Sequence, residues 1–203
     1  MENSEIFEQR DAGPGKKKKD KVCLSNLHDV VFLVAGVLLV FSILFRVVIV
    51  SGPSMKNTLI DGDWLLLMGN VLYRNPEQGD VIVACKEAYE NGTPIVKRVI
   101  ATEGQVVDID FVTGTVKVDG KVLHEPYILT PTDRDEGVKF PLTVPEGCLF
   151  VLGDNRGESK DSRSPEIGLI DEREVLGKAI FIVFPGNDKG NIERDIGRIG
   201  VIS

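Results

Sequence analysis

Apolar and polar positions divide the chain into three parts with different patterns. Residues 1–26 are polar and have no hydrophobic periodicity, which favours a disordered tail. From Val30 to Val50 the chain is almost continuously apolar, and Arg46 is the one charged residue in that run. After Val50, apolar residues come in short runs bounded by Gly, Asp, Asn and Pro. This order predicts a polar tail, one long apolar helix and a domain built mainly from strands.

The apolar run is long enough for a membrane span. A helix from Val30 to Val50 would be about 31 Å long, which matches the hydrocarbon thickness of a bilayer. A cleaved signal peptide is the main alternative, but its apolar region should be shorter and followed by a small-x-small site, which residues 45–50 do not contain. A buried core helix is a third alternative, weakened because the run has no polar face. We therefore expect residues 27–50 to form a transmembrane anchor.

Charge is distributed unevenly on the two sides of this run. Residues 16–21 read KKKKDK, whereas residues 51–203 contain 17 Lys and Arg against 25 Asp and Glu. The positive-inside rule therefore predicts a cytoplasmic tail over residues 1–26 and an extracytoplasmic domain over residues 51–203. The net charge of −7 and a pI near 5 argue against a nucleic-acid partner, because phosphate binding needs clustered Lys and Arg.

Seven short apolar runs predict the strands of the extracytoplasmic domain. Their lengths and the turn residues between them are typical of a mainly antiparallel β domain. Residues 118–121, Val-Asp-Gly-Lys, predict a tight hairpin turn, and the polar residues 130–141 predict a surface loop. The seven runs cover residues 64–68, 81–84, 95–100, 106–111, 115–118, 148–152 and 178–184.

The three cysteines predict neither a metal site nor a disulfide framework, because none of them is in a CxxC motif. Cys23 lies before the anchor, so only Cys85 and Cys148 could pair. Two unpaired cysteines packed in strands are the simpler expectation. No cofactor is predicted.

Ser54 follows the apolar run in a segment that can continue neither a helix nor a regular strand, because Gly52 and Pro53 precede it. Such a segment can be a simple turn. It can also present the hydroxyl as a nucleophile, provided that a base removes its proton. His124 is the one histidine after the anchor, and nothing beside it suggests a catalytic triad.

Lys97 is the better candidate for the base. It lies in the apolar run 95–100 and, by strand alternation, shares a face with Ile95 and Val99. If that face is buried, desolvation lowers the pKa of the amine and makes the neutral form available near pH 7. A strand lysine whose amine reaches solvent is the alternative. Lys178, next to Gly177 at a strand edge, is a weaker candidate.

A polar loop over residues 153–165 completes the pattern, and at this point the motifs resemble those of bacterial type I signal peptidases. The resemblance extends from about residue 30 to residue 185. It implies a membrane-anchored serine endopeptidase that removes signal peptides from exported preproteins, with the antiparallel β fold shared by signal peptidases and repressor-cleaving peptidases. The matching motifs lie at residues 52–59, 62–63, 79–83, 97–100, 153–163 and 168–179.

The resemblance also implies roles for individual residues. Ser54 matches the nucleophile and Lys97 the general base of a Ser/Lys dyad. Ser159 matches a second serine whose hydroxyl holds the lysine amine. The residues that match the supporting loop are Asp154 and the structural pair Asp161 and Arg163.

The chain departs from the family pattern at several positions. Gly52 stands where some members carry a hydroxyl that helps the backbone N–H of the nucleophile to form the oxyanion hole, so the chain is similar to the Gram-positive variety. Asn57 stands where proline is usual, and residues 102–105 replace the common turn after the lysine motif. The accessory β region, about residues 104–148, is short.

The expected partners follow from the same resemblance. They are the signal peptides of preproteins, cut after small-x-small (Ala-x-Ala) sites, the lipid bilayer and the secretion translocase, with the enzyme in the cell membrane as a single-pass protein. A repressor-type Ser/Lys peptidase is the nearest alternative, although such proteins carry a DNA-binding region in place of an anchor. A membrane-tethered β module without catalytic activity is an alternative from another class.

Overall fold

The computed structural model describes residues 15–86, 89–187 and 194–202, with side chains from residue 27 onward except that of residue 90. It divides into two compact units, one that ends at Ser42 and one that begins at Ile43. Helix α1 (Gly15–Leu44) makes up the described part of the first unit and its last two residues enter the second. Within α1, residues Leu27–Leu44 are long and apolar enough to cross a membrane.

The helix differs from the predicted anchor at both ends. Residues 15–26, predicted to be a disordered tail, are helical, whereas residues 1–14 lie outside the described residues. The apolar run also leaves the helix before Val50, because β1 (Phe45–Ile49) pairs with β2 from Phe45↔Met68 to Ile49↔Trp64. Hydropathy alone cannot distinguish an apolar strand from the end of an apolar helix, and the β-branched residues 47–49 favour the strand.

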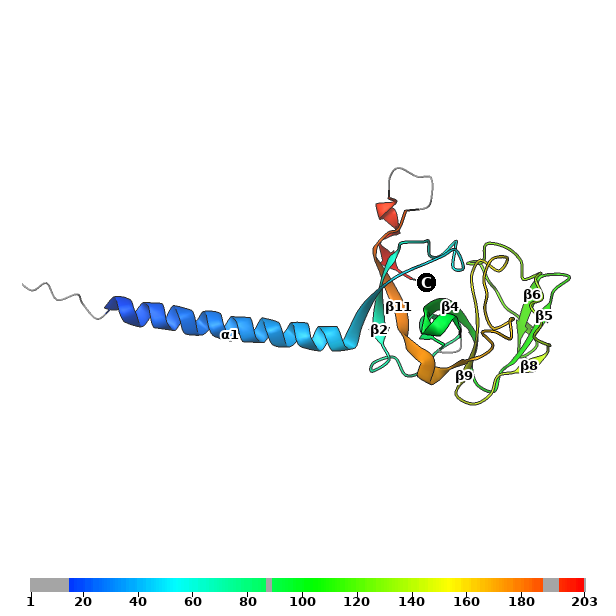
Figure 1. Ribbon diagram of the computed structural model, residues 1–203, viewed down its shortest axis with the longest axis horizontal. Helices are drawn as coiled ribbons and strands as arrows, with labels where there is room; N and C mark the ends of the chain where they lie inside the picture. Colours follow the sequence, from blue (N-terminus) through cyan, green and yellow to red (C-terminus); the bar gives the residue numbers. More distant parts are fainter. Residues whose placement is uncertain (1–14, 87–88, 188–193, 203) are drawn as a thin grey trace, which may run out of the picture. The chain divides into compact units, whose positions relative to one another are not determined.

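One large antiparallel sheet forms the centre of the second unit (Figure 1). Its strand order is β1-β2-β11-β3-β4-β9-β10, and β12 pairs with β11. Strands distant in sequence are thus neighbours, and Ser54 contacts both Lys97 of β4 and Asn155, which follows β9. The strands are β2 (Trp64–Gly69), β3 (Val81–Cys85), β4 (Pro94–Ala101), β9 (Cys148–Leu152), β10 (Ile170–Asp171), β11 (Val175–Phe184) and β12 (Gly200–Val201).

A smaller antiparallel sheet corresponds to the predicted accessory region. It has the order β7-β6-β5-β8, and Figure 1 shows β5, β6 and β8 grouped away from β2 and β11. Asp119 and Gly120 both have positive φ between β6 and β7, so the predicted hairpin turn is present. The elements are β5 (Val106–Asp110), β6 (Thr115–Val118), β7 (Lys121–Val122) and β8 (Leu142–Thr143), with short 3-10 helices η1 (Glu90–Gly92), η2 (Glu172–Glu174) and η3 (Ile196–Arg198) elsewhere.

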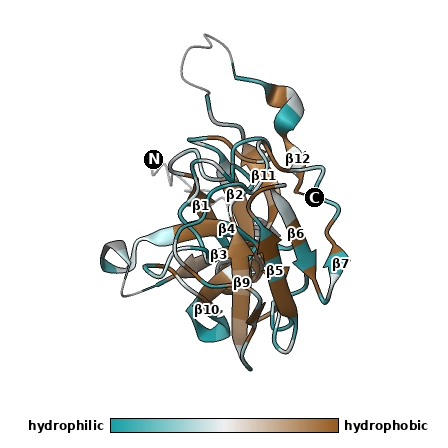
Figure 2. Ribbon diagram, turned by 90° about the vertical axis from the view of Figure 1, so that its right-hand side faces the viewer, coloured by the Kyte–Doolittle hydropathy of each residue, from teal (hydrophilic) through white to brown (hydrophobic). Residues whose placement is uncertain are grey.

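The cores of the two sheets lie on apolar strand faces, which Figure 2 shows as brown segments of β4, β5 and β9. All seven predicted strands are present, and the prediction of a mainly antiparallel β domain is confirmed. The structure adds β1 and four strands of two residues, which are too short for alternation to reveal. Cys85 and Cys148 are unpaired, as expected.

Candidate active site

Ser54 lies in a loop over residues 50–63 that is closed at its base and held by two apolar side chains. Val50 N donates to Asp63 O at 2.9 Å, and Gly62 N donates to Val50 O at 2.9 Å. Met55 and Leu59 are buried in the core next to β2 and β3. We call residues 50–63 the nucleophile loop, since the apolar anchors on one side leave Ser54 on the other.

Two positions of the nucleophile loop have a backbone conformation that decides which residue fits. Gly52 has φ of 90°, and its N–H donates to Asp61 Oδ1 at 2.8 Å. Asn57 has φ of 99°, and its side-chain amide donates to Tyr127 O at 2.9 Å. Proline, which the family pattern favours at position 57, has φ fixed near −65° and could not adopt this conformation. The departure at Asn57 therefore matches the geometry of this loop.

Lys97 lies in β4 with its amine next to the Ser54 hydroxyl. Its Nζ is 2.9 Å from Ser54 Oγ, and the residue is 5% exposed. Ile95 and Val99, on the same face of β4, belong to one apolar cluster, as strand alternation predicts. The structure thus brings together the serine and the lysine that the sequence indicates.

Burial changes the acid–base properties of this lysine. Desolvation by the surrounding apolar groups lowers the pKa of Lys97 from 10.5 to about 8. The carboxylates of Asp161 and Asp154 act in the opposite direction, and the Arg163 guanidinium adds a smaller lowering effect. A substantial fraction of the amine is therefore neutral slightly above pH 7, as a base for a hydroxyl requires.

Asp154 fixes the strand residue next to Lys97. Its carboxylate accepts two hydrogen bonds from Arg98, at 2.9 Å from Nε and 2.8 Å from Nη2, and both side chains are buried. The Thr58 hydroxyl donates to the same carboxylate at 2.5 Å. Tyr127 covers the Arg98 guanidinium, which lies 4.0 Å from the ring centroid. Asp154 therefore connects β4 with the nucleophile loop.

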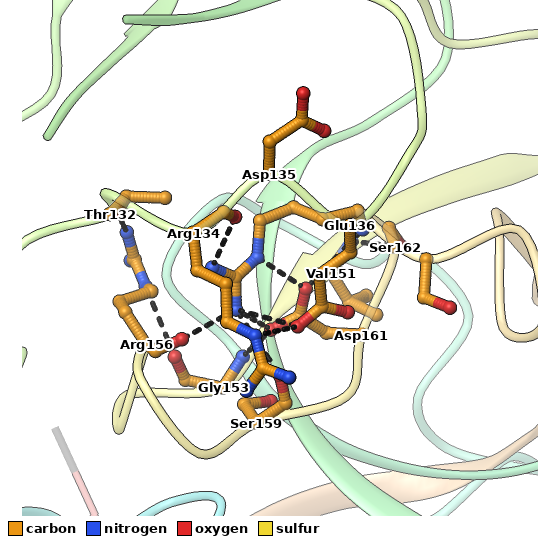
Figure 3. A network of polar contacts seen from close by, with 12 residues as sticks. Thr132, Arg134, Asp135, Glu136, Val151, Gly153, Arg156, Ser159, Asp161 and Ser162 are labelled. Carbon is orange, nitrogen blue, oxygen red and sulfur yellow. Dashed lines mark hydrogen bonds and ion pairs between the residues drawn. The ribbon is translucent and has the colours of Figure 1, made fainter. Parts of the chain in front are cut away.

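Asp161 and Arg163 form a buried pair inside the polar loop that follows β9. Figure 3 shows Asp161 together with Gly153 and Ser159 in the network of polar contacts of this loop. Arg163 donates to Asp161 through Nε at 2.8 Å and Nη2 at 2.9 Å, and Gly153 N donates to the same carboxylate at 3.0 Å. Arg163 also donates to Arg156 O at 2.8 Å. These bonds hold the loop in one conformation beside the active site.

Asn155 connects this loop directly to the segment that carries Ser54. Its backbone N–H donates to Ser54 O at 3.0 Å and its side-chain amide donates to Pro53 O at 3.1 Å. A Cβ on Gly153 would lie 2.5 Å from Ser54 O, so only glycine allows this close approach. Sequence reasoning assigned no role to Asn155 or to Tyr127. Asn155 lies within a matching motif, whereas nothing in the sequence marks Tyr127.

Ser159 is close to the site but does not make the predicted contact. It is 1% exposed, and its Oγ has no hydrogen-bond partner among the described residues. A Cβ on Gly153 would lie 2.1 Å from this Oγ, so the hydroxyl faces the same backbone that packs against Ser54. In this structure the Lys97 amine is held by Ser54, and the predicted bond from Ser159 to the amine is absent.

The other candidate bases are elsewhere. Lys178 lies in β11 and forms an ion pair with Asp80 at 2.5 Å. His124 is exposed. Among the described residues, no group of three or more His, Cys, Asp or Glu could hold a metal ion. The Lys97 amine is thus the base that the described geometry offers to Ser54.

A cavity of about 310 Å³ opens beside Ser54 and Lys97. One wall comes from Val48 and Ile49 of β1, and the other comes from the first half of β4. In the described sheet, β1 pairs only with β2, while residues 94–97 of β4 pair only with β3. Both walls therefore have an edge with unpaired backbone groups, which can accept an extended peptide.

Comparison with known proteins gives the family. A profile described as "Signal peptidase, peptidase S26" matches residues 24–184. The chain belongs to this signal peptidase family. It is similar to Signal peptidase I of Bacillus licheniformis, with 36% identity over 167 residues, covering 78% of this chain and 87% of the relative. It is also similar to Signal peptidase I T of Bacillus subtilis (strain 168), with 34% identity over 180 residues, covering 85% and 91%.

Among solved structures, a signal peptidase I from Enterococcus faecalis V583 is 30% identical, with a TM-score of 0.42, covering 52% of this chain and 97% of that chain. Membership of the signal peptidase family makes the protein a hydrolase that cleaves signal peptides. The family therefore rules out a tethered binding module and a repressor-type peptidase, the two alternatives left open by the sequence.

Proposed function

We propose that Ser54 and Lys97 form a Ser/Lys dyad with which this signal peptidase cleaves the signal peptides of exported preproteins after Ala-x-Ala sites. The observation that carries the proposal is the 2.9 Å distance between the buried Lys97 amine and the Ser54 hydroxyl, in a cavity that both residues line. The pKa of about 8 at Lys97 supports the role of a base, because part of the amine is neutral at a pH slightly above 7.

In the first half of the reaction, neutral Lys97 takes the Ser54 proton while Ser54 Oγ attacks the scissile carbonyl carbon. The tetrahedral intermediate collapses when the Lys97 ammonium gives the proton to the leaving nitrogen, which becomes the new N-terminus of the mature protein. The signal peptide is then bound to Ser54 as an ester. Lys97 is neutral again, so it can take a proton from a water molecule whose oxygen attacks the ester carbon. The Lys97 ammonium then gives this proton to Ser54 Oγ as the ester bond breaks and the signal peptide leaves with a free carboxylate.

The intermediate carries a negative oxygen that needs hydrogen-bond donors. The backbone N–H of Ser54 has no acceptor among the described residues and is therefore available to this oxyanion. Gly52 offers no hydroxyl, so a second donor must be a water molecule or another amide. Removal of one such donor in other serine peptidases costs about 3 kcal/mol of transition-state stabilisation. A second donor at this site would supply transition-state stabilisation of the same order.

The substrate binds as an added strand between β1 and the first half of β4. Their unpaired backbone edges supply hydrogen bonds, and the cavity between them receives side chains next to the scissile bond. In an extended peptide, alternate side chains point to the same face. The two alanines of an Ala-x-Ala site would therefore enter the cavity together while the middle residue points away.

The helix supplies the membrane anchor in this proposal. Residues Leu27–Leu44 cross the bilayer, with the KKKKDK segment on the cytoplasmic side and the β domain outside. The domain boundaries become a tail over residues 1–26, an anchor over residues 27–44 and a catalytic unit from Phe45 onward, with residues 104–148 as the accessory sheet. The bilayer and the secretion translocase are then the surroundings in which the enzyme meets preproteins.

The decisive experiment compares the full-length wild type with Ser54→Ala and Lys97→Met in detergent. Each is incubated with an exported precursor, and the appearance of the mature form is measured. The wild type should produce the mature form, and both variants should leave the precursor intact while melting as cooperatively as the wild type. Cleavage by Ser54→Ala at the wild-type rate would exclude the proposed nucleophile.

A further inference from the structure

The last described segment, residues 194–202, lies beyond residue 184, where the match to the family profile ends. It returns to the large sheet, where β12 pairs with β11 and Ile202 N donates to Ile180 O at 3.2 Å. Arg194 starts the segment, donating to Pro185 O at 2.9 Å and lying 4.6 Å from the centre of the Phe184 ring. The segment is therefore docked on β11 by its own contacts.

Arg198 projects from this segment towards the base of the nucleophile loop. It lies in η3, whose first turn is capped by Asp195 through a 2.9 Å bond from Gly197 N. The Arg198 guanidinium donates to both oxygens of Asp63, from Nη1 and Nη2 at 2.8 Å each. Asp63 is fully buried, so this two-point bond neutralises a charge that has no access to water.

Asp63 and Arg198 form hydrogen bonds with several residues of the nucleophile loop. The Asp63 carboxylate accepts from Ile60 N at 2.8 Å and from Gly186 N at 2.7 Å, while Asp63 O accepts from Val50 N. Arg198 Nη2 also donates to Thr58 O at 3.1 Å. The Thr58 hydroxyl binds Asp154, the residue that fixes Arg98 beside Lys97.

We propose that Arg198 is a positioning residue for catalysis, which holds the nucleophile loop so that Ser54 stays within reach of Lys97. The inference rests on the proposed roles of these two residues. The serine and the lysine lie on separate elements, and their 2.9 Å separation depends on where the loop stands relative to β4. Arg198 fixes both the closing residue of the loop, Asp63, and its middle, at Thr58. The segment beyond the family match therefore supports the active site.

The test compares Arg198→Gln, Arg198→Lys and the matched control Arg194→Gln in the full-length enzyme with a precursor peptide. Arg194 is in the same segment, but its contacts reach only the end of β11. Because small misplacements of reacting groups are costly, Arg198→Gln should lower kcat by about 10- to 100-fold while KM stays within about twofold. Arg198→Lys, which keeps the charge and loses the fork, should recover part of kcat. Arg194→Gln should keep the wild-type kcat.

Thermal melting, followed through the fluorescence of Trp64, the single tryptophan, shows which variants are folded at the assay temperature. If Arg198→Gln does not fold, the test uses Arg198→Lys, and the positioning role predicts that this folded variant has a kcat below that of the wild type. A folded Arg198 variant with wild-type kcat, or an equal loss of kcat in Arg194→Gln, overturns the positioning role. Ser54→Ala distinguishes the failure of this inference from the failure of the proposed function. If Ser54→Ala is inactive and Arg198→Gln is fully active, only the positioning role of Arg198 is rejected. If Ser54→Ala is active, the proposed function is rejected.

Discussion

At the scale of single residues, Lys97 combines a chemical use with a cost in stability. Burial disfavours its charged form, which lowers the pKa from 10.5 to about 8. Between these two values the unfolded chain binds more protons than the folded chain, so the free energy of unfolding rises with pH in this range. Below about pH 8 the folded protein carries the full penalty of a buried ammonium group. The active site therefore keeps a residue that weakens the fold at neutral pH.

Lys97→Met tests this conflict between activity and stability. Methionine fills a similar volume without a charge, so it should abolish cleavage and raise the free energy of unfolding at pH 7 by about 1 to 3 kcal/mol. The difference should shrink as the pH approaches 10.5, the ordinary pKa of lysine. Denaturant unfolding of both proteins at several pH values gives the comparison. A variant less stable than the wild type at pH 7 would contradict the account.

Asn57→Pro is a second test at this scale. Proline is the usual residue of the family pattern, yet Asn57 has φ of 99°, which proline cannot adopt. The substitution should therefore lower the melting temperature and the cleavage rate. Asn57→Gly is the control, since glycine accepts this φ and only the bond to Tyr127 O is lost. Wild-type melting and activity in Asn57→Pro would mean that the loop differs from the structure described.

At the scale of elements, the strand β4 and the polar loop over residues 153–165 contribute different groups to the site. β4 carries Lys97, the proposed base, and the loop contributes buried ion pairs next to it. The Asp161 carboxylate has two effects, because it neutralises Arg163 and also raises the pKa of Lys97. The loop therefore contributes to the stability of the domain and to the pH at which the amine becomes neutral.

Asp161→Asn should reveal both effects. Arg163 is fully buried, and the loss of its closest carboxylate should cost about 3 kcal/mol of stability or more. The pH midpoint of kcat/KM should also move below that of the wild type, because the carboxylate that raises the pKa of Lys97 is gone. The control is Arg173→Gln, which removes an exposed pair with Asp171 and should change neither quantity measurably. An unchanged midpoint in a folded Asp161→Asn would contradict the electrostatic role.

The strands and the site residues differ in how well the sequence alone could predict them. Short apolar runs between turn residues predicted the seven strands, alternation placed Lys97 on the same face of β4 as Ile95 and Val99, and the resemblance to the family indicated Ser54 and Lys97. The strand β1 was missed because the apolar run continues without a break from helix to strand. Arg198 was missed because it has no motif, and its contact with Asp63 joins residues distant in sequence. Long-range contacts of this kind leave no local pattern.

At the scale of the whole molecule, the uneven charge predicts the orientation of the chain. The lysines of residues 16–21 precede the span Leu27–Leu44, and an acidic domain follows it. In right-side-out membrane vesicles, added protease should therefore digest the β domain and leave a tag at residue 1 intact. Replacement of Lys16–Lys19 by Gln should weaken this preference and expose part of the tag. A tag that is digested in wild-type vesicles would contradict the proposed topology.

The central claim is that a neutral Lys97 amine removes the proton of Ser54, and the pH dependence of kcat/KM for a precursor peptide tests it most directly. The account predicts a rise of about tenfold per pH unit at low pH that levels off with a midpoint of about 8. A profile without a rise between pH 6 and 9, or a midpoint near 10.5, the value for an exposed lysine, would contradict it.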